Sequence, residues 1–444
     1  MPSDLINWSA RRNPFRRLSL VAVLCICAGL SCAAHAGEPT PYGEYFIRLG
    51  EHRPAVGAVT PQIAGPESSL VQDSASYEQE LHLLESQGGP YSSSLAEPLA
   101  DLARLHRQGG DVKQAQQVYQ RALHVLRVNE GLYSERQVPI LKELFEIYRM
   151  TGDMATLDAR YDYYFRLYGN GQPPYSPARL GAALEYLQWQ REALRLEVDE
   201  REVKRLLALY TLNEEILQGV RADPEADPDS YRDLVFSQVR NLYLLENLYE
   251  PNEDIIGIAS GSRIAAAPWG EEQDGNKHRL ELFQRRALAH GRELLEDLIA
   301  RTPPDQVEAL ATSYLELADW NQWNDRRAEA LAAYGQVEEV LQSAGQTDLL
   351  EQLLGQPVEL PANGVFWQPR QLPPGEAPVV VQVRYDVTAR GRADNIEATA
   401  VSSEHAGKAG RLRRYLGQTR FRPRIVNGAP EAELHLLRDY EVLN

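Results

Sequence analysis

The hydrophobic residues in the middle of the chain recur at three- and four-residue spacing, which is the pattern of helices that bury one face. Two markers in this region repeat every 42 residues. They are a tyrosine at Tyr77, Tyr119 and Tyr161, and a Tyr-Ser pair at residues 91–92, 133–134 and 175–176. A fixed period of this length is typical of helical repeats, in which each repeat packs only against its neighbours. The pattern predicts an all-α repeat region over residues 71–190.

The best-defined repeat contains a series of small and apolar residues at Leu102, Ala103, Gly110, Ala115, Tyr119 and Ala122. This series resembles the tetratricopeptide pattern, in which small residues let paired helices approach closely and a glycine turns the chain between them. The period of 42 residues exceeds the roughly 34 typical of that family and is similar to its long-helix variant. The resemblance implies a superhelix that holds partner proteins in a concave groove.

Helical periodicity continues over residues 191–355 without the 42-residue markers. A further unit repeats the spacing of the first one at Tyr314, Leu317, Ala318, Ala330 and Tyr334. Residues 251–277 interrupt the periodicity with four glycines and are expected to form a long internal loop. Loops of that length are usually functional or disordered. An enzyme site with Ser260 or Ser262 as nucleophile stays open there, although no histidine partner is suggested by position.

Hydrophobic and polar residues alternate at the end of the chain, after the proline-rich residues 356–377 that are expected to form a linker or docking strap. In residues 378–444, alternation over 379–387 and 396–400 predicts two strands joined by a turn at Gly391. Apolar residues at helical spacing follow between residues 404 and 418. Two more strands are expected at residues 421–423 and 432–442. The order predicts a small α+β domain of the form β-β-α-β-β.

The valine-rich first strand of this domain is followed by Gly391, Ser402-Ser403, Phe421-x-Pro423 and Gly428-x-Pro430. In this order they resemble the C-terminal domain of TonB-like energy transducers. The resemblance implies a periplasmic module whose exposed strand edge pairs with an extended segment of an outer-membrane receptor. The edge of a small sheet presents unpaired backbone groups that accept another strand. The alternative is a small stable domain used as a terminal cap or docking piece, because fold does not fix function.

The first 36 residues have the composition of a secretory signal peptide. Four arginines between residues 11 and 17 precede an apolar run at residues 18–30, and Ala34-His35-Ala36 offers a small-x-small cleavage site. The run has 13 residues, whereas a membrane span needs about 20, so cleavage after Ala36 is favoured over a retained anchor. Residues 37–70 are rich in proline, glycine and small residues and are expected to form a flexible lead-in to the helices.

Cysteine and charge are both unevenly distributed. All three cysteines, Cys25, Cys27 and Cys32, fall in the leader, so an exported product has no disulfide and no cysteine-ligated metal. Residues 37–377 contain 31 basic and 54 acidic residues, a net charge of −23, whereas residues 378–444 contain 11 basic and 8 acidic residues, a net charge of +3. The acidic body and the expected export disfavour nucleic acid as a partner.

The basic residues of the terminal domain are the candidate partner-binding residues. They are Lys408, Arg411, Arg413, Arg414, Arg420, Arg422 and Arg424. No acidic residue interrupts them between His405 and Pro430. We expect them to attract an anionic partner, such as an acidic receptor segment or a cell-wall polymer. The alternative is a solvated helix face together with contacts to the acidic repeats.

The sequence lacks the motifs of common catalytic and metal sites, including Gly-x-Ser-x-Gly, His-Glu-x-x-His and Ser-x-x-Lys. Asp223, Asp227 and Asp229 lack the glycine and the distal glutamate of a calcium loop, so a solvated loop is favoured there. His106 and His124 fall on repeat helices, where packing or surface roles are favoured. No catalytic, cofactor-binding or metal-ligating residue is assigned.

These patterns together predict a multidomain, non-enzymatic periplasmic adaptor. We expect the repeats to bind other envelope proteins, while the terminal domain engages an extended strand or another envelope component, without a cofactor. Outside the leader, no run is long enough to span a membrane, so the mature form is expected to be soluble. The alternative is an accessory TonB-type energy transducer for outer-membrane transport, which requires an uncleaved N-terminal anchor.

Overall fold

The computed structural model describes six ranges of the chain, namely residues 46–49, 67–199, 202–247, 271–366, 379–400 and 405–442. Side chains are described within them except at residues 46–49, 67–74, 271–274 and 441–442. The chain divides into two units, Met1–Glu38 and Pro39–Asn444, and all described residues belong to the second. The expected signal peptide, Ser260, Ser262 and Ser402-Ser403 lie outside the described residues.

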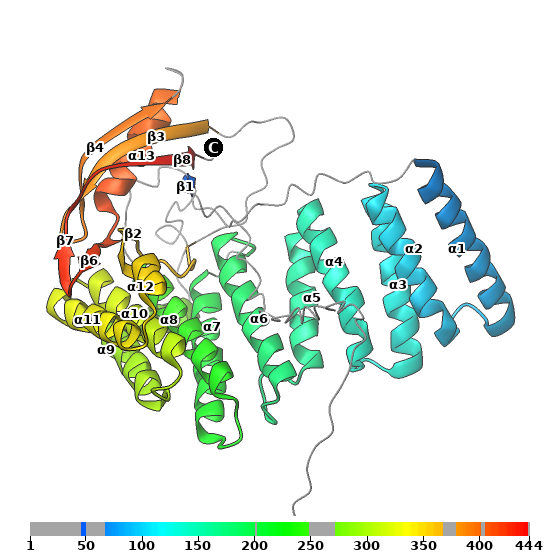
Figure 1. Ribbon diagram of the computed structural model, residues 1–444. Coiled ribbons are helices and arrows are strands. Elements are labelled where there is room, and N and C mark those ends of the chain that lie inside the picture. Colours follow the sequence, from blue (N-terminus) through cyan, green and yellow to red (C-terminus); the bar gives the residue numbers. More distant parts are fainter. Residues whose placement is uncertain are drawn as a thin grey trace, which may run out of the picture. The chain divides into compact units, whose positions relative to one another are not determined.

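Helices dominate residues 67–354, and each of them packs against the helix that precedes it in sequence (Figure 1). Their bounds are α1 (Glu67–Gly88), α2 (Ala96–Gln108), α3 (Val112–Glu130), α4 (Val138–Thr151), α5 (Met154–Leu167), α6 (Pro177–Arg195), α7 (Glu202–Ala222), α8 (Pro228–Asn247), α9 (Glu271–Arg301), α10 (Val307–Trp323), α11 (Arg327–Ser343) and α12 (Thr347–Leu354). The expected helical repeat region is therefore confirmed. A smaller region that contains strands follows it, as predicted.

The turns between paired helices show why the repeat contains a glycine. Gly110 joins α2 to α3 with a φ of +83°, and Gly152 joins α4 to α5 with a φ of +73°. Residues with a Cβ rarely adopt this backbone conformation. Asp111 and Asp153 follow these glycines, and each caps the next helix by accepting a hydrogen bond from the amide three residues later. A Gly-Asp pair thus ends one helix and begins the next.

The 42-residue markers also have structural explanations. Tyr119 and Tyr161 are buried on α3 and α5, which are the second helices of consecutive pairs. The serine of the other marker begins a helix. Ser134 caps the 3-10 helix η2 (Glu135–Gln137) that leads into α4, and Ser176 caps α6. The period therefore reflects one buried contact and one helix start in each repeat.

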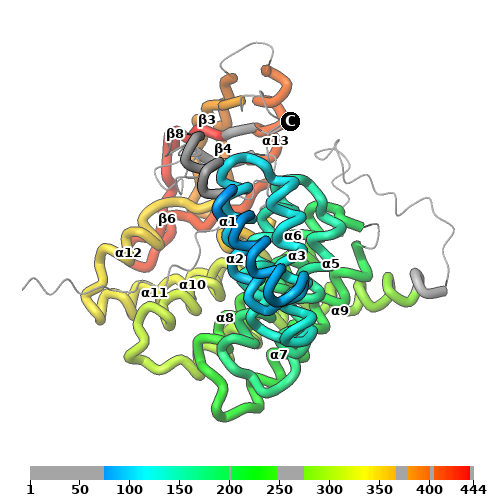
Figure 2. The backbone as a smooth tube through the Cα atoms, turned by 90° about the vertical axis from the view of Figure 1, so that its right-hand side faces the viewer, coloured from blue at the N-terminus to red at the C-terminus, as the bar shows by residue number. Residues whose placement is uncertain are grey.

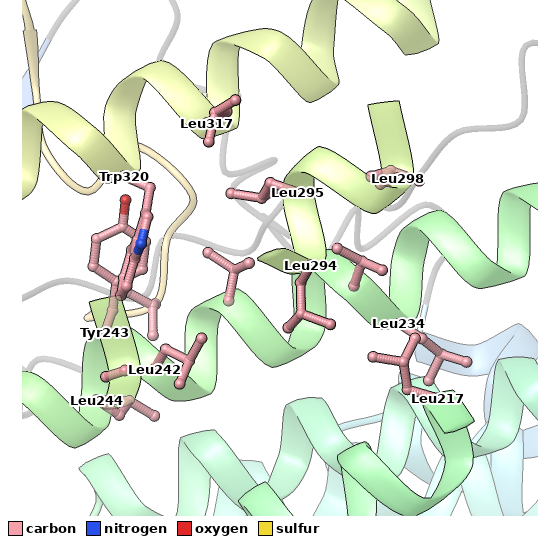
Figure 3. Packing of buried hydrophobic residues seen from close by; sticks show 14 of the residues in the cluster. Leu217, Leu234, Leu242, Tyr243, Leu244, Leu294, Leu295, Leu298, Leu317 and Trp320 are labelled. Atoms are coloured by element: carbon pink, nitrogen blue, oxygen red, sulfur yellow. The ribbon is translucent and has the colours of Figure 1, made fainter. Parts of the chain in front are cut away.

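Two hydrophobic clusters fill the helical region, one built mainly from α1–α6 and the other mainly from α6–α12. In the second cluster, the rings of Tyr243 on α8 and Trp320 on α10 meet edge to face, with centroids 4.8 Å apart (Figure 3). Val365, Phe366 and Ile425 belong to the same cluster. Residues of the proline-rich stretch and of the terminal domain are thus packed into the helical core.

The terminal domain starts with a hairpin of β3 (Val379–Val387) and β4 (Ala393–Ala400), followed by α13 (Ala406–Gln418), as the sequence predicts. The long strand β8 (Glu433–Val442) returns antiparallel to β3, and the sheet has the order β1-β8-β3-β4. Helix α13 lies beside these strands (Figure 2). Its buried residues Ala409, Leu412 and Leu416 form a small core with inward residues of the sheet.

The strand expected at residues 421–423 does not join this sheet. Instead, β5 (Phe421–Arg422) pairs with β2 (Val358–Glu359), which lies in the stretch expected to be a linker. Next, β6 (Arg424–Val426) and β7 (Ala429–Glu431) form a separate hairpin. The reason is contact with α10, where the Gln322 side chain donates a hydrogen bond to the Phe421 carbonyl over 3.1 Å. The terminal domain is therefore joined to the helices through β5.

The alternation over the last strand predicts that Leu434 lies on the buried face. This prediction is wrong, because 61% of Leu434 is exposed. His435 has a φ of +58°, and the register of β3 with β8 shifts between Tyr385 and Val387. An irregularity of this kind changes which side chains face the core.

Three boundaries differ from expectation. The strand β1 (Phe46–Leu49) lies inside the expected flexible lead-in and pairs with β8, and α1 begins at Glu67. Helix α9 begins at Glu271, so the last residues of the expected 251–277 loop are helical. Of the expected linker at 356–377, residues 356–366 are described and contain β2.

Candidate protein-interaction site

A cavity of about 320 Å3 opens between alternate helices of the first repeats. It is lined by Arg107, Lys142, Glu143, Phe145, Glu146, Tyr161 and Glu185. These side chains come from the end of α2, from α4 and α5, and from α6. We call this cavity the α4 pocket, because α4 provides most of its lining. Its wall combines both signs of charge with aromatic rings, which is a composition suited to a polar ligand with an apolar anchor.

Ion pairs bridge neighbouring helices at the α4 pocket. Lys142 on α4 is paired with Glu185 on α6, and Arg107 Nη1 lies 2.9 Å from Glu143 Oε2. The Tyr164 hydroxyl donates to Glu185 Oε2 over 3.0 Å, and Lys142 Nζ lies 4.3 Å from the centre of the Tyr164 ring. Since these side chains are partly exposed, each pair stabilises the fold by little, and its charges stay accessible.

A stack of aromatic rings forms the inner wall of the pocket. Phe145 stacks on Tyr161 with centroids 4.2 Å apart, and Tyr161 stacks on Trp189 at 4.8 Å. Arg149 Nη2 donates to the Tyr161 hydroxyl and to Glu192 Oε2, each over 3.1 Å. Burial raises the pKa of Tyr161, so its hydroxyl stays protonated at neutral pH. The inner wall is thus an apolar surface with fixed hydrogen-bonding groups.

Helices α6, α8 and α10 bind a segment of the same chain. We call residues 360–366 the strap. Arg240 Nε on α8 donates to the carbonyl of Asn363, and Arg195 Nη2 on α6 donates to the carbonyl of Phe366, each over 3.2 Å. The side-chain amide of Asn363 in turn donates a hydrogen bond to Glu316 Oε1 on α10 over 2.7 Å. Helices α6, α8 and α10 therefore hold the strap through its backbone and one polar side chain.

Phe366 is the apolar anchor of the strap. Only 7% of it is exposed, the Arg195 guanidinium lies 5.3 Å from its ring centre, and the Trp323 ring centre lies 6.1 Å away. Helices α6, α8 and α10 thus bind this polypeptide segment in two ways. Arginines bind its backbone carbonyls, and one aromatic side chain is buried. Helix α6 takes part both in the strap contacts and in the α4 pocket.

Between its pocket residue Glu185 and its strap residue Arg195, helix α6 carries a buried cation, Arg191, which has no acidic partner among the described residues. Arg191 is 7% exposed, and its Nη1 donates to Ser237 Oγ over 2.8 Å and to Asn241 Oδ1 over 3.1 Å. Within the described ranges its hydrogen-bond partners are all neutral. Burial, together with the nearby Arg240 charge, lowers the pKa of Arg191 to about 9. Arg191 is thus held inside the helical core by neutral groups of α8, and it is not among the residues that line the α4 pocket.

Sequence analysis did not single out Lys142, Glu185, Arg149 or Glu192. A signal was present, because the partners Lys142–Glu185 and Arg149–Glu192 are both 43 residues apart. This separation is close to the repeat period, so the opposite charges fall on neighbouring repeats at equivalent helix positions. Periodicity of charge, in addition to periodicity of tyrosine, indicates the pocket wall.

Three of the candidate partner-binding residues contact acidic side chains of the same chain. Arg422 is buried, and it donates to Asp319 Oδ1 over 2.8 Å and to Asp319 Oδ2 over 2.5 Å. Arg420 Nη2 lies 3.0 Å from Asp325 Oδ2, also in the helical region, and Arg424 Nη1 lies 3.3 Å from Glu433 within the terminal domain. Arg420 and Arg422 therefore both contact acidic residues of the helical region.

The other candidate residues gather on α13. Arg413 and Arg414 are exposed, and Lys408 and Arg411 are partly buried. All four lie within this one short helix, which precedes β5 in sequence. As a site for an anionic partner, these residues remain a proposal.

Two further features of the described residues bear on function. None of the described helices has both the length and the apolar character required to cross a membrane. Within the described ranges, no three histidine, cysteine, aspartate or glutamate side chains are grouped so that they could hold a metal ion. Asp223 and Asp227 accept hydrogen bonds from the amides of Glu225 and Ser230, as residues that shape turns do.

Comparison with protein-family models found no match to this chain, and comparison with curated proteins found none either. Among solved structures, the chain is similar to a putative kinesin light chain with nearly identical TPR-like repeats from Podosopora anserina, and to a variant of that protein with a single substitution. Each match has 15% sequence identity and covers 57% of this chain and 98% of the other. The TM-score is 0.28 in both cases, which is too low to support an inference. The repeat architecture stands on the helix packing described above.

Proposed function

We propose that this protein is a non-enzymatic scaffold that binds a segment of a partner polypeptide at the α4 pocket. The observation that carries this proposal is that α6, α8 and α10 already bind the strap, while α6 also lines the α4 pocket together with α2, α4 and α5. A region of helical repeats that binds one polypeptide segment at one end is suited to bind a second segment at its other end.

The chemistry of the pocket indicates what the partner segment contains. By analogy with the strap, arginine and lysine side chains bind its backbone carbonyls, and an aromatic or large aliphatic side chain packs against the stack of Phe145 and Tyr161. A carboxylate in the segment would pair with Arg107 or Lys142, the two cations of the pocket wall. The proposed ligand is therefore a short segment with one apolar anchor and one acidic residue.

For location, we propose export to the periplasm with removal of residues 1–36, on the composition of the leader. There the terminal domain, which resembles the C-terminal domain of TonB-like transducers, engages a strand or an anionic component of the envelope. The alternative of an energy transducer requires residues 11–30 to remain attached. Mass spectrometry of the exported protein decides between them, since a mature N-terminus at Gly37 rules out the transducer.

The pocket is tested with a peptide library displayed on phage and selected on the purified protein. We expect peptides with an apolar anchor and an acidic residue to be enriched. The substitution Lys142→Glu should weaken their binding at least tenfold, because it reverses the charge next to Glu185. Lys113→Glu, on the exposed side of α3, is the matched control and should leave affinity unchanged.

A second variant separates binding from folding. The exchange Lys142→Glu with Glu185→Lys restores an opposite-charge pair between α4 and α6 while it moves the cation to the other helix. We expect this variant to recover the unfolding midpoint of the unmodified protein but not its peptide affinity. Enrichment of no peptide, or of peptides whose affinity is the same for all three variants, contradicts the proposed function.

A further inference from the structure

The outermost strand on one side of the terminal sheet comes from the opposite end of the sequence. Strand β1 pairs antiparallel with the end of β8, in the register Phe46 with Val442, Ile47 with Glu441, Arg48 with Tyr440 and Leu49 with Asp439. The sheet order β1-β8-β3-β4 makes β1 the edge strand. The β8 edge therefore accepts a strand that is not part of the terminal domain.

The pairing of β1 covers only part of that edge. Strand β1 has 4 residues and β8 has 10. The first six residues of β8, 433–438, have no strand partner on that side among the described residues. Leu434 and Leu437 in this part are each 61% exposed. An uncovered edge with exposed leucines is a surface on which a longer strand gains both backbone hydrogen bonds and buried apolar area.

In the described structure, the backbone of β1 contacts the sheet through its pairing with β8. The next described element in sequence is α1, which packs on η1 (Ser93–Leu95) and α2 at the start of the helical region. Helix packing of α1 therefore does not hold β1 on the sheet. This pairing covers four residues, which is shorter than the roughly five or six residues of a typical strand.

We infer that Phe46–Leu49 is an exchangeable cap, which closes the β8 edge until an extended apolar segment of a partner protein replaces it. Three of its four residues, Phe46, Ile47 and Leu49, are apolar, which indicates the kind of strand that the edge prefers. A partner strand of about eight to ten residues would reach Leu434 and Leu437 and so exceed what the cap provides. The partner strand binds only those molecules in which the β8 edge is open. The cap therefore reduces the apparent affinity for the partner in proportion to the fraction of such molecules.

This inference rests on the strand engagement proposed above for the terminal domain, and it does not depend on the α4 pocket. The register is tested first, by cross-linking in a protein whose Cys25, Cys27 and Cys32 are replaced by serine. The pair Ile47→Cys with Glu441→Cys places two cysteines directly opposite one another, so it should form a disulfide within one chain. The offset pair Ile47→Cys with Asp439→Cys should not. Equal cross-linking of both pairs, or of neither, overturns the inference.

Exchange is tested with a fluorescein-labelled synthetic peptide of residues 43–50, Gly-Glu-Tyr-Phe-Ile-Arg-Leu-Gly. Ile47→Pro is expected to weaken the cap, because proline is disfavoured within a paired strand. Ile47→Val keeps a β-branched residue and is the control. By fluorescence anisotropy, we expect the peptide to bind Ile47→Pro at least tenfold more tightly than it binds the unmodified protein or Ile47→Val. Equal affinity for all three proteins, or no binding to Ile47→Pro, overturns the inference.

Discussion

The contact between Arg422 and Asp319 predicts the largest effect of any single charge that the structure describes. Arg422 lies on β5 and Asp319 on α10, 103 residues apart, and their side chains are 5% and 4% exposed. Two hydrogen bonds join them, at 2.8 and 2.5 Å. The Leu353 carbonyl accepts a third hydrogen bond from Arg422 over 2.7 Å, and the Tyr334 hydroxyl donates to Asp319 over 2.8 Å.

Arg422→Ala leaves the Asp319 carboxylate buried, with Tyr334 as its remaining donor. Removing one partner of a buried pair costs about 3–5 kcal/mol, because the other charge stays in a poorly solvated site. Arg422→Lys keeps the charge but loses the two-pronged geometry, so we expect an intermediate loss. Replacing both residues, as Asp319→Leu with Arg422→Met, removes the unpaired charge and should recover most of the stability.

The assay is equilibrium unfolding in urea, followed by far-ultraviolet circular dichroism. A double-mutant cycle over the unmodified protein, Asp319→Leu, Arg422→Met and the double variant gives the coupling between Arg422 and Asp319. Arg413→Ala, on the exposed face of α13, is the control for loss of an arginine and should change stability by less than about 0.5 kcal/mol. A loss of stability below about 1 kcal/mol for Arg422→Ala refutes the reasoning. A double variant that is no more stable than Arg422→Met refutes it as well.

Three further predictions concern the same junction. Burial raises the pKa of Glu246 to about 7. The contribution of Glu246 to the free energy of unfolding should therefore fall as pH rises from about 4.5 to 7, because the unfolded carboxyl loses its proton first. Glu246→Gln should remove this decline and stabilise the protein at pH 8 by about 2–3 kcal/mol in urea titrations, and an unchanged pH profile contradicts the assignment. Gly391 has a φ of +70°, and a Cβ there would lie 2.0 Å from the Phe421 carbonyl oxygen, so Gly391→Ala should destabilise by at least about 1–3 kcal/mol. A thermal midpoint equal to that of the unmodified protein would argue against this close approach. Phe366→Ala should cost about 3–5 kcal/mol by calorimetry, because the strap loses its buried anchor, whereas a cost near zero would show that the strap is held by its backbone alone.

Local patterns predict the helical region well, because its signals are confined to one repeat. Gly110 and Gly152 turn the chain where the sequence places them, and the tyrosine period marks a buried position on α3 and α5. The same holds for the hairpin of β3 and β4 and for α13. In these elements the period of the hydrophobic residues and the turn residues agree, so local sequence is sufficient.

The contacts that join distant parts of the chain could not be predicted in this way. Arg422 belongs to a basic stretch that is typical of an exposed face, and only the position of Asp319, far away in sequence, makes it a buried residue. Nothing local indicates that β5 leaves the main sheet to pair with β2, or that β1 pairs with β8. The irregularity near His435, which exposes Leu434, is likewise set by pairing with β3 and not by the alternation itself.

The charge asymmetry of the chain has a structural consequence at the junction. Arg420 and Arg392 of the terminal domain both lie close to Asp325, and Arg422 binds Asp319. Part of the basic surplus of the terminal domain is thus used to dock it on the acidic helices. The exposed arginines of α13, Arg413 and Arg414, remain the candidates for an anionic partner.

The central claim is that a partner polypeptide binds at the α4 pocket, and site-specific photo-cross-linking in cells that produce the protein tests it most directly. A photoreactive residue is placed at Glu146, which is exposed and lines the pocket, and in a second strain at Glu339, which is exposed on α11. We predict a covalent adduct with another polypeptide at Glu146 that disappears with Lys142→Glu, and none at Glu339. Adducts that are equal at both positions, or that persist with Lys142→Glu, would contradict the claim.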